Sequence, residues 1–195
     1  YAGRGIAHSE RTPPEVTART RTSHGLQLWL ALPDSHEEME PAFFGYSPES
    51  LPETEVAGVK VRVIIGEAYG LTSPAETYSP TLYFEAHLPA GKSLTLPTEV
   101  AEKAFYPISG AVSVDGVSVP AHTMGVCNPG VPVSIKAEAD THLVVIGGEA
   151  LGQRHIWWNF VSSDKERIEQ AKADWKGRRF PLIPGDEEEF VPLPE

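Results

Sequence analysis

A histidine and a carboxylate lie two residues apart near the start of the sequence, at His8 and Glu10. On an extended strand, side chains at positions i and i+2 point to the same face, so both could reach one ion. A nitrogen donor together with an oxygen donor suits iron, manganese, nickel, copper or zinc. Residues 5–10 are predicted to form the strand that presents them. Two polar residues on a surface strand would give the same pattern, so the pair alone leaves both interpretations open.

Two ligands do not complete a metal site, and no later segment supplies the missing ones. The sequence begins at Tyr1 and not at a methionine. We therefore expect the chain to be the later part of a longer protein, divided within its metal-binding domain. On this expectation, residues 1–195 by themselves would bind little specific metal and would be inactive.

The other histidines give weaker signals. His87 shares a predicted strand face with Glu85, but a site there is not supported by any motif, and His122 and His142 are expected to be structural or exposed. The single cysteine, Cys127, follows apolar residues in a predicted strand. We expect a buried and unreactive thiol there.

Composition limits the classes of function. The 195 residues include 27 acidic and 16 basic side chains, giving a net charge of −11. Because nucleic-acid affinity depends on positive charge, no nucleic-acid partner is expected. No apolar run is long enough to cross a bilayer, so no membrane partner is expected either. One cysteine cannot form an intrachain disulfide, which is consistent with a reducing compartment, and we expect a cytoplasmic protein.

The pattern of apolar residues predicts an all-β fold. With 18 prolines and 17 glycines, the chain has many turn positions, and many short strands at close spacing indicate a sandwich or barrel. Leucines alternate with other residues over 26–32, which predicts a strand with one buried face. Asp115-Gly116 between apolar runs indicates a hairpin. Further strands are predicted near residues 59–68, 81–88, 104–108, 111–114, 117–119, 125–127, 131–137 and 142–146.

One helix is predicted, over residues 164–176. Ser163 and Glu166 have the spacing of a capping box, and Gly177 follows as a typical stop. The segment after the helix is rich in proline and acid. We expect this irregular tail to lie along another part of the protein, with Phe180 and Phe190 among its apolar anchors.

Three segments of the chain resemble the pirin family. Residues 2–10 (AGRGIAHSE) resemble the segment that closes the first barrel of pirins, and residues 25–33 (GLQLWLALP) resemble the strand that begins their second half. The stretch from residues 147–152 (GGEALG) through 157–160 (WWNF) to the final helix is also similar. The resemblance implies a bicupin, in which two double-stranded β-helix (jelly-roll) barrels follow one another. It divides the chain into the end of a first cupin and a linker (1–22), a second cupin barrel (23–160), and a helix and tail that pack back on the barrels (161–195).

The resemblance also implies a metal and an activity. In pirins three histidines and one glutamate hold a metal in the first barrel, and His8 and Glu10 match the last two of these ligands. Iron is the first expectation, with nickel, copper, manganese or zinc also open. The implied activity is that of quercetin 2,3-dioxygenase, in which Glu10 is a ligand and a proton acceptor and a flavonol is opened by dioxygen with release of carbon monoxide. The alternative is a non-enzymatic co-regulator that binds a protein partner under the control of the metal.

The second barrel has the spacing of a cupin without its ligands. When the cupin motifs are laid on the sequence, Pro97 and Glu99 stand at two histidine positions, Lys103 at the glutamate position, and Gly125 at the last histidine position. Proline has no donor atom for a metal, and the lysine ammonium is cationic. We expect this barrel to hold no metal.

Overall fold

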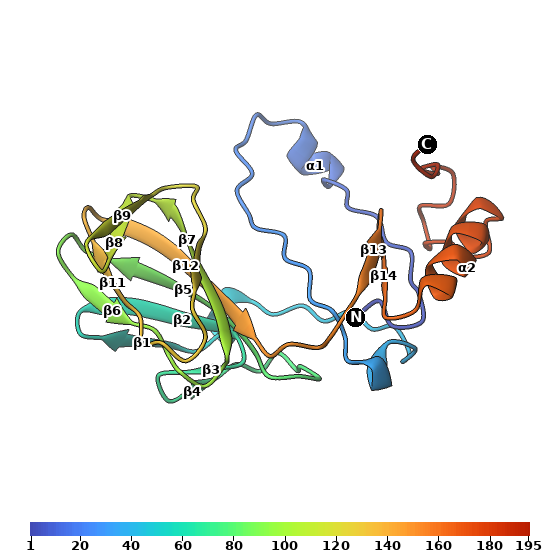
Figure 1. Ribbon diagram of the computed structural model, residues 1–195. Helices are drawn as coiled ribbons and strands as arrows, with labels where there is room; N and C mark the ends of the chain where they lie inside the picture. The colour runs from blue at the N-terminus through green and yellow to red at the C-terminus, as the bar shows by residue number, and fades with distance from the viewer. The chain divides into compact units, whose positions relative to one another are not determined.

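The computed structural model describes residues 1–195, and the chain divides into two compact units. Residues 44–150 form one unit, called here the β unit, which contains most of the strands (Figure 1). Residues 1–43 and 151–195 form the other, called here the helix–tail unit. The domain boundaries expected from the sequence, after residues 22 and 160, remain predictions.

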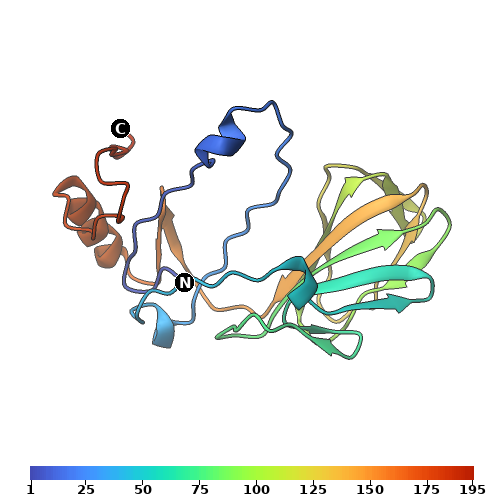
Figure 2. The same cartoon turned by 180° about the vertical axis from the view of Figure 1, so that it is seen from behind.

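The β unit consists of two antiparallel sheets, which face each other (Figures 1 and 2). In the larger sheet the strand order is β1 (Glu53–Val56), β2 (Val59–Ile65), β5 (Thr81–Leu88), β12 (Thr141–Gly148), β7 (Glu102–Ser109) and β10 (Gly125–Cys127). In the smaller sheet it is β6 (Ser93–Thr95), β11 (Ser134–Ala137), β8 (Ala111–Val114) and β9 (Val117–Pro120). A short pair, β3 (Glu67–Ala68) and β4 (Leu71–Thr72), and a 3-10 turn, η2 (Pro48–Ser50), complete it. The sequence prediction of an all-β sandwich or barrel is confirmed.

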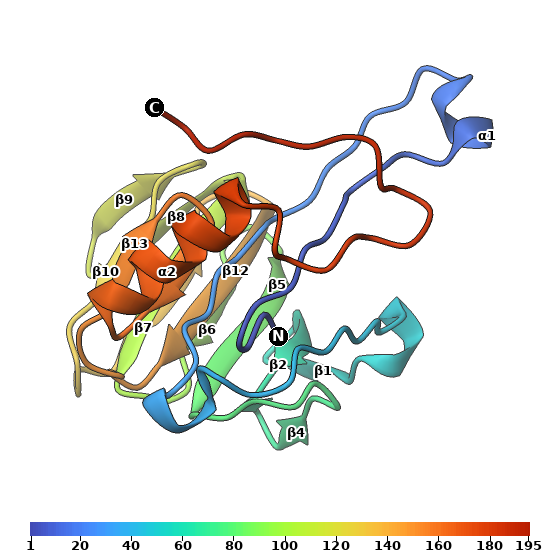
Figure 3. The same ribbon diagram turned by 90° about the vertical axis from the view of Figure 1, so that its right-hand side faces the viewer.

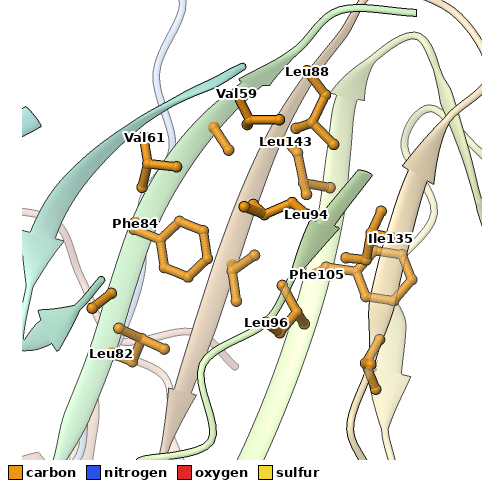
Figure 4. Packing of buried hydrophobic residues seen from close by; sticks show 14 of the residues in the cluster. Val59, Val61, Leu82, Phe84, Leu88, Leu94, Leu96, Phe105, Ile135 and Leu143 are labelled. Atoms are coloured by element: carbon orange, nitrogen blue, oxygen red, sulfur yellow. The ribbon is translucent and has the colours of Figure 1, made fainter. Parts of the chain in front are cut away.

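The core of the β unit lies between the sheets (Figure 4). Along β5, Leu82, Phe84, Ala86 and Leu88 are buried, and the residues between them are not. The period-2 pattern arises because successive side chains of a strand point to opposite faces. The same alternation buries one face of β2. The opposite faces of these strands therefore carry polar side chains on the outer surface of the larger sheet.

The hairpin predicted at Asp115-Gly116 is present between β8 and β9. Asp115 has a φ of 51° and Gly116 a φ of 80°. Positive φ at both central residues is the type I′ conformation, whose twist matches that of the paired strands.

The helix–tail unit contains α2 (Lys165–Lys176) against the hairpin of β13 (His155–Trp157) and β14 (Phe160–Ser162) (Figure 3). It also has one helical turn, α1 (Pro14–Thr17), and a 3-10 turn, η1 (Asp34–His36). Asp164 caps α2 by accepting the backbone N–H of Glu166 at 2.8 Å. The predicted cap at Ser163 was wrong by one residue, because the Ser163 hydroxyl instead donates to Glu37 at 2.8 Å. No helix of the protein combines the length and apolar character that crossing a membrane requires.

Two predicted strands in the helix–tail unit are absent. Residues 5–10 and 26–32 are irregular, and Leu26, Leu28 and Leu30 are exposed. Alternating residues specify a strand only where a neighbouring strand accepts its backbone hydrogen bonds. Neither segment has such a neighbour among residues 1–195.

Candidate metal centre

The sequence-predicted ligands His8 and Glu10 are both on an irregular, exposed segment of the helix–tail unit, so the extended strand that would place them on one face is absent. Neither side chain is engaged in a hydrogen bond or an ion pair. No third histidine, cysteine or carboxylate lies close enough to complete a three-ligand cluster with them. The donor types fit a divalent transition metal, but residues 1–195 contribute only two ligands at this position.

The glycine-rich segment before His8 is held by close backbone contacts. Arg4 donates its backbone N–H to Met39 O at 3.0 Å. A Cβ at Gly3, which has a φ of 48°, would lie 2.2 Å from that same carbonyl oxygen. A Cβ at Gly5 would meet the Phe180 ring at 3.0 Å. Glycine is required where the backbone approaches this closely, so the two glycines fix the path that leads to His8.

His8 lies at the edge of a hollow of about 370 Å³ within the helix–tail unit. Aromatic side chains form much of its wall: Trp158, Phe160, Trp175 and Phe180. The Trp158 ring contacts the Trp175 ring edge to face, with 5.4 Å between the centroids. Arg4, Arg167, Glu37 and Glu38 also line it. A hollow with an aromatic wall and a few polar groups is typical of a small-molecule site.

The interior of the β unit offers a different environment at the cupin ligand positions. Lys103 is buried and donates from Nζ to Val100 O at 2.7 Å. A Cβ at Gly125 would lie 2.2 Å from the Phe105 ring. The space that a histidine at Gly125 would need is therefore filled by an aromatic side chain. Cys127, also buried, has a raised thiol pKa because burial disfavours the thiolate.

The structure brings three potential ligands together elsewhere, on the outer face of the larger sheet. Glu85 and His87 come from β5, and His142 comes from β12. His142 Nε2 lies 3.0 Å from Glu85 Oε2, and one potential ligand atom of each residue lies within 4.8 Å of those of the other two. His87 and His142 are directly opposite in the strand register, and their rings stack with 4.3 Å between centroids.

Charged neighbours fix the carboxylate of this cluster. Arg62 on β2 is the register partner of Glu85 and donates from Nη1 to Glu85 Oε1 at 2.8 Å. Arg62 and Lys60 both pair with Glu53 on β1, whose single carboxylate offsets part of their positive charge. Partial desolvation lowers the pKa of His87, although its side chain reaches solvent, and His142 beside it lowers the pKa further. Both effects favour the neutral imidazole, which is the form that binds metals.

Sequence reasoning recognised part of this cluster and missed the rest. That Glu85 and His87 share a strand face followed from the alternation in residues 81–88. His142, 57 residues from Glu85, was expected to be structural or exposed. The alternation in the predicted strand 142–146 indicated that His142 points outward. Neither segment by itself indicates that this strand pairs with β5.

The fold of the β unit defines a class: two antiparallel sheets closing on one apolar interior make it a cupin barrel. The profile of the pirin C-terminal cupin domain matches residues 83–181. A pirin-like protein of Caulobacter vibrioides is 45% identical over 195 residues, covering all of this chain and 67% of its own length. The chain belongs to the pirin family.

Other similar proteins extend the comparison. Human pirin is 35% identical over 186 residues, which are 91% of this chain and 62% of human pirin. A crystal structure of quercetin 2,3-dioxygenase from Acinetobacter baumannii is 27% identical, with a TM-score of 0.77 over 86% of this chain and 57% of that chain. The chain thus spans about two thirds or less of the length of these relatives.

Proposed function

We propose that the protein is a metal-dependent dioxygenase of the quercetin 2,3-dioxygenase type, in which His8 and Glu10 are two of the metal ligands. The observation that carries the proposal is the likeness to the Acinetobacter baumannii quercetin 2,3-dioxygenase, with a TM-score of 0.77. A cupin dioxygenase of this kind implies a bound metal, with iron as our first expectation. The pirin pattern assigns two further histidine ligands, which are not found near His8 among residues 1–195.

The surroundings of His8 support a planar aromatic substrate. The hollow beside it is walled by indole and phenyl rings, which pack favourably against other aromatic rings. A bound metal would supply Lewis acidity toward a flavonol oxygen and reactivity toward dioxygen. In this proposal His8 holds the metal, Glu10 holds it and accepts the proton of the flavonol hydroxyl, and the aromatic wall excludes water.

The experiment gives quercetin under air to the full-length protein loaded in turn with iron, nickel and copper. Loss of the flavonol absorbance with release of carbon monoxide is the expected result. His8→Ala should lose the metal held by the His8–Glu10 pair and with it turnover, and Glu10→Gln should lower kcat by roughly 100-fold. His24→Ala is the matched control, because His24 is an exposed imidazole outside the hollow. Absence of turnover with every metal would overturn the proposal.

A second candidate function is that of a co-regulator that binds a protein partner and depends on the metal. The observation in its favour is the net charge of −11, which suits a basic partner surface. The candidate predicts that a partner captured by the metal-loaded protein is lost with His8→Ala and retained with His24→Ala. Capture that is the same with both variants would rule out control by the metal.

A further inference from the structure

We propose that the outer face of the β unit carries a second, independent site for a divalent transition metal, formed by Glu85, His87 and His142. Two imidazoles and one carboxylate are ligands that zinc, nickel, copper and iron accept. This site is distinct in sequence and location from the His8–Glu10 pair. It also departs from the expectation that the barrel holds no metal, which concerned the ligand positions of the barrel interior.

The distances between ligand atoms favour this interpretation. With metal–nitrogen and metal–oxygen distances of about 2.1 Å, neighbouring ligand atoms lie roughly 3.0 Å apart at a right angle and roughly 3.4 Å apart in a tetrahedron. His142 Nε2 and Glu85 Oε2 are already 3.0 Å apart. A cation between these two atoms would replace the proton on His142 Nε2. If the imidazole is charged, that proton is released to solvent. If it is neutral, the proton moves to Nδ1.

The third ligand needs only a small side-chain movement. His87 lies on the neighbouring strand directly opposite His142, and its ligand atom is within 4.8 Å of those of the other two residues. Its side chain is exposed and its ring is held only by stacking on His142. Rotation about the side-chain bonds of His87 can therefore bring its nitrogen to the ion without moving the backbone, which the sheet fixes.

The neighbouring charges prepare the carboxylate for this role. Arg62 occupies Glu85 Oε1 at 2.8 Å and leaves Oε2 for the cation. Such outer contacts orient a ligand and tune its affinity for metal. Glu53 pairs with both Arg62 and Lys60, so its carboxylate offsets part of the positive charge beside the site.

The cluster also opens to solvent, which three-ligand sites need for their remaining ligands. His87 and His142 line a shallow, open hollow of about 450 Å³ that Pro89, Ser109 and Asp140 also border. Water molecules or a small anion can reach an ion held at the three side chains from this side. The geometry thus fits a site with three protein ligands and open positions.

The test titrates the untagged chain with Ni²⁺ and Cu²⁺ as the metals alone. We expect one equivalent to bind, with copper electron paramagnetic resonance showing two imidazole nitrogens. His87→Ala, at an exposed position, should leave the fold intact and weaken binding roughly tenfold or more, as should His142→Ala, because even outer-shell losses cost that much. His24→Ala removes an imidazole elsewhere and should bind as the parent does.

His8→Ala separates this proposal from the proposed function. If it leaves the one-equivalent binding unchanged while His87→Ala weakens it, the outer-face site is supported, whatever the outcome with quercetin. If binding is unaffected by both His87→Ala and His142→Ala, or is lost with His8→Ala, the proposal is overturned. Substoichiometric binding to the parent chain would overturn it as well.

Discussion

The two units of the molecule are stabilised in different ways. The β unit buries aliphatic side chains together with Phe84 and Phe105 between its two sheets. Outside it, only two apolar side chains are buried, Ile168 and Ala171 of α2. The helix–tail unit is instead built from aromatic ring contacts and ion pairs, and it leaves Trp29 and Phe43 exposed. Burial of apolar area is the larger stabilising contribution and exposed ion pairs add little, so we expect the β unit to be the more stable of the two.

The sequence provides a separate probe for each unit. All four tryptophans, at positions 29, 157, 158 and 175, belong to the helix–tail unit, and the single cysteine, Cys127, belongs to the β unit. Tryptophan fluorescence therefore reports unfolding of one unit and thiol labelling reports opening of the other. The comparison can be tested by directing substitutions at each unit and recording both signals.

The largest effect is expected from Phe84→Ala in the core of the β unit. The Phe84 side chain is 0% exposed and contacts Tyr69 edge to face at 5.6 Å. Its truncation leaves a cavity and should lower the free energy of unfolding by about 3–5 kcal/mol. Denaturant titration followed by Cys127 labelling should show the loss as a lower midpoint.

Val117→Ala on β9 is the control for that substitution. The Val117 side chain is 66% exposed, so its truncation should change stability by less than about 0.5 kcal/mol. An equal effect of the two substitutions would contradict the assignment of the stability of the β unit to its buried core.

The next largest effect is expected from Glu37→Gln in the helix–tail unit. The Glu37 carboxylate accepts the Ser163 N–H at 2.9 Å and the Ser163 hydroxyl at 2.8 Å, and it pairs with Arg154 at 2.9 Å. The side chains of Glu37 and Arg154 are only 14% and 9% exposed. Removing one charge of a buried pair should cost about 3 kcal/mol, seen as a lower midpoint of tryptophan fluorescence.

Asp34→Asn supplies the matched control. Asp34 also pairs with Arg154, at 2.6 Å, but its side chain is 73% exposed. Solvent screens such a pair, and its loss should cost less than about 1 kcal/mol. If both substitutions lowered the midpoint equally, the burial of Glu37 would not be what stabilises this unit.

What the sequence predicted differs between the units for a physical reason. In the β unit, strands such as 81–88 and the Asp115-Gly116 turn were predicted correctly, because alternation and turn chemistry are local properties that the core then uses. In the helix–tail unit the alternation over 26–32 predicted a strand that does not form, because no partner strand is present to pair with it. Local pattern is thus sufficient only where the tertiary structure completes it.

The same distinction applies to the candidate metal ligands. His8 and Glu10 are two residues apart, so a local spacing rule revealed them, and their role stays a prediction. Glu85 and His142 meet only because β5 and β12 pair. A cluster that depends on strand pairing across 57 residues has no local signature, so only the structure shows it.

A smaller effect, confined to the helix–tail unit, is expected from Asp164→Ala at the start of α2. The Asp164 side chain accepts the Glu166 N–H at 2.8 Å, and loss of an N-cap costs about 1 kcal/mol. The tryptophan midpoint should fall and the Cys127 labelling midpoint should stay. Asp164→Asn keeps a capping acceptor and should restore most of the stability; a failure to do so would show that the side chain does not act as a cap.

The smallest effect is expected in the pH dependence of stability, which should differ between the tryptophan midpoint and the Cys127 labelling midpoint. Arg11 hydrogen-bonds to Asp186 and lowers the pKa of that carboxyl below its ordinary value of 3.8. The unfolded chain therefore binds a proton more readily than the folded one, so this contribution is present above about pH 4 and is lost as the pH falls through the lower folded pKa. Asp186→Asn should make the tryptophan midpoint less sensitive to acid, leaving the labelling midpoint of Cys127 unchanged. Because the Arg11 side chain is 50% exposed, salt screens the pair, and raising the salt concentration should have the same effect in the parent chain. An acid response that neither change reduces would come from other carboxylates, such as Asp174 beside Arg179.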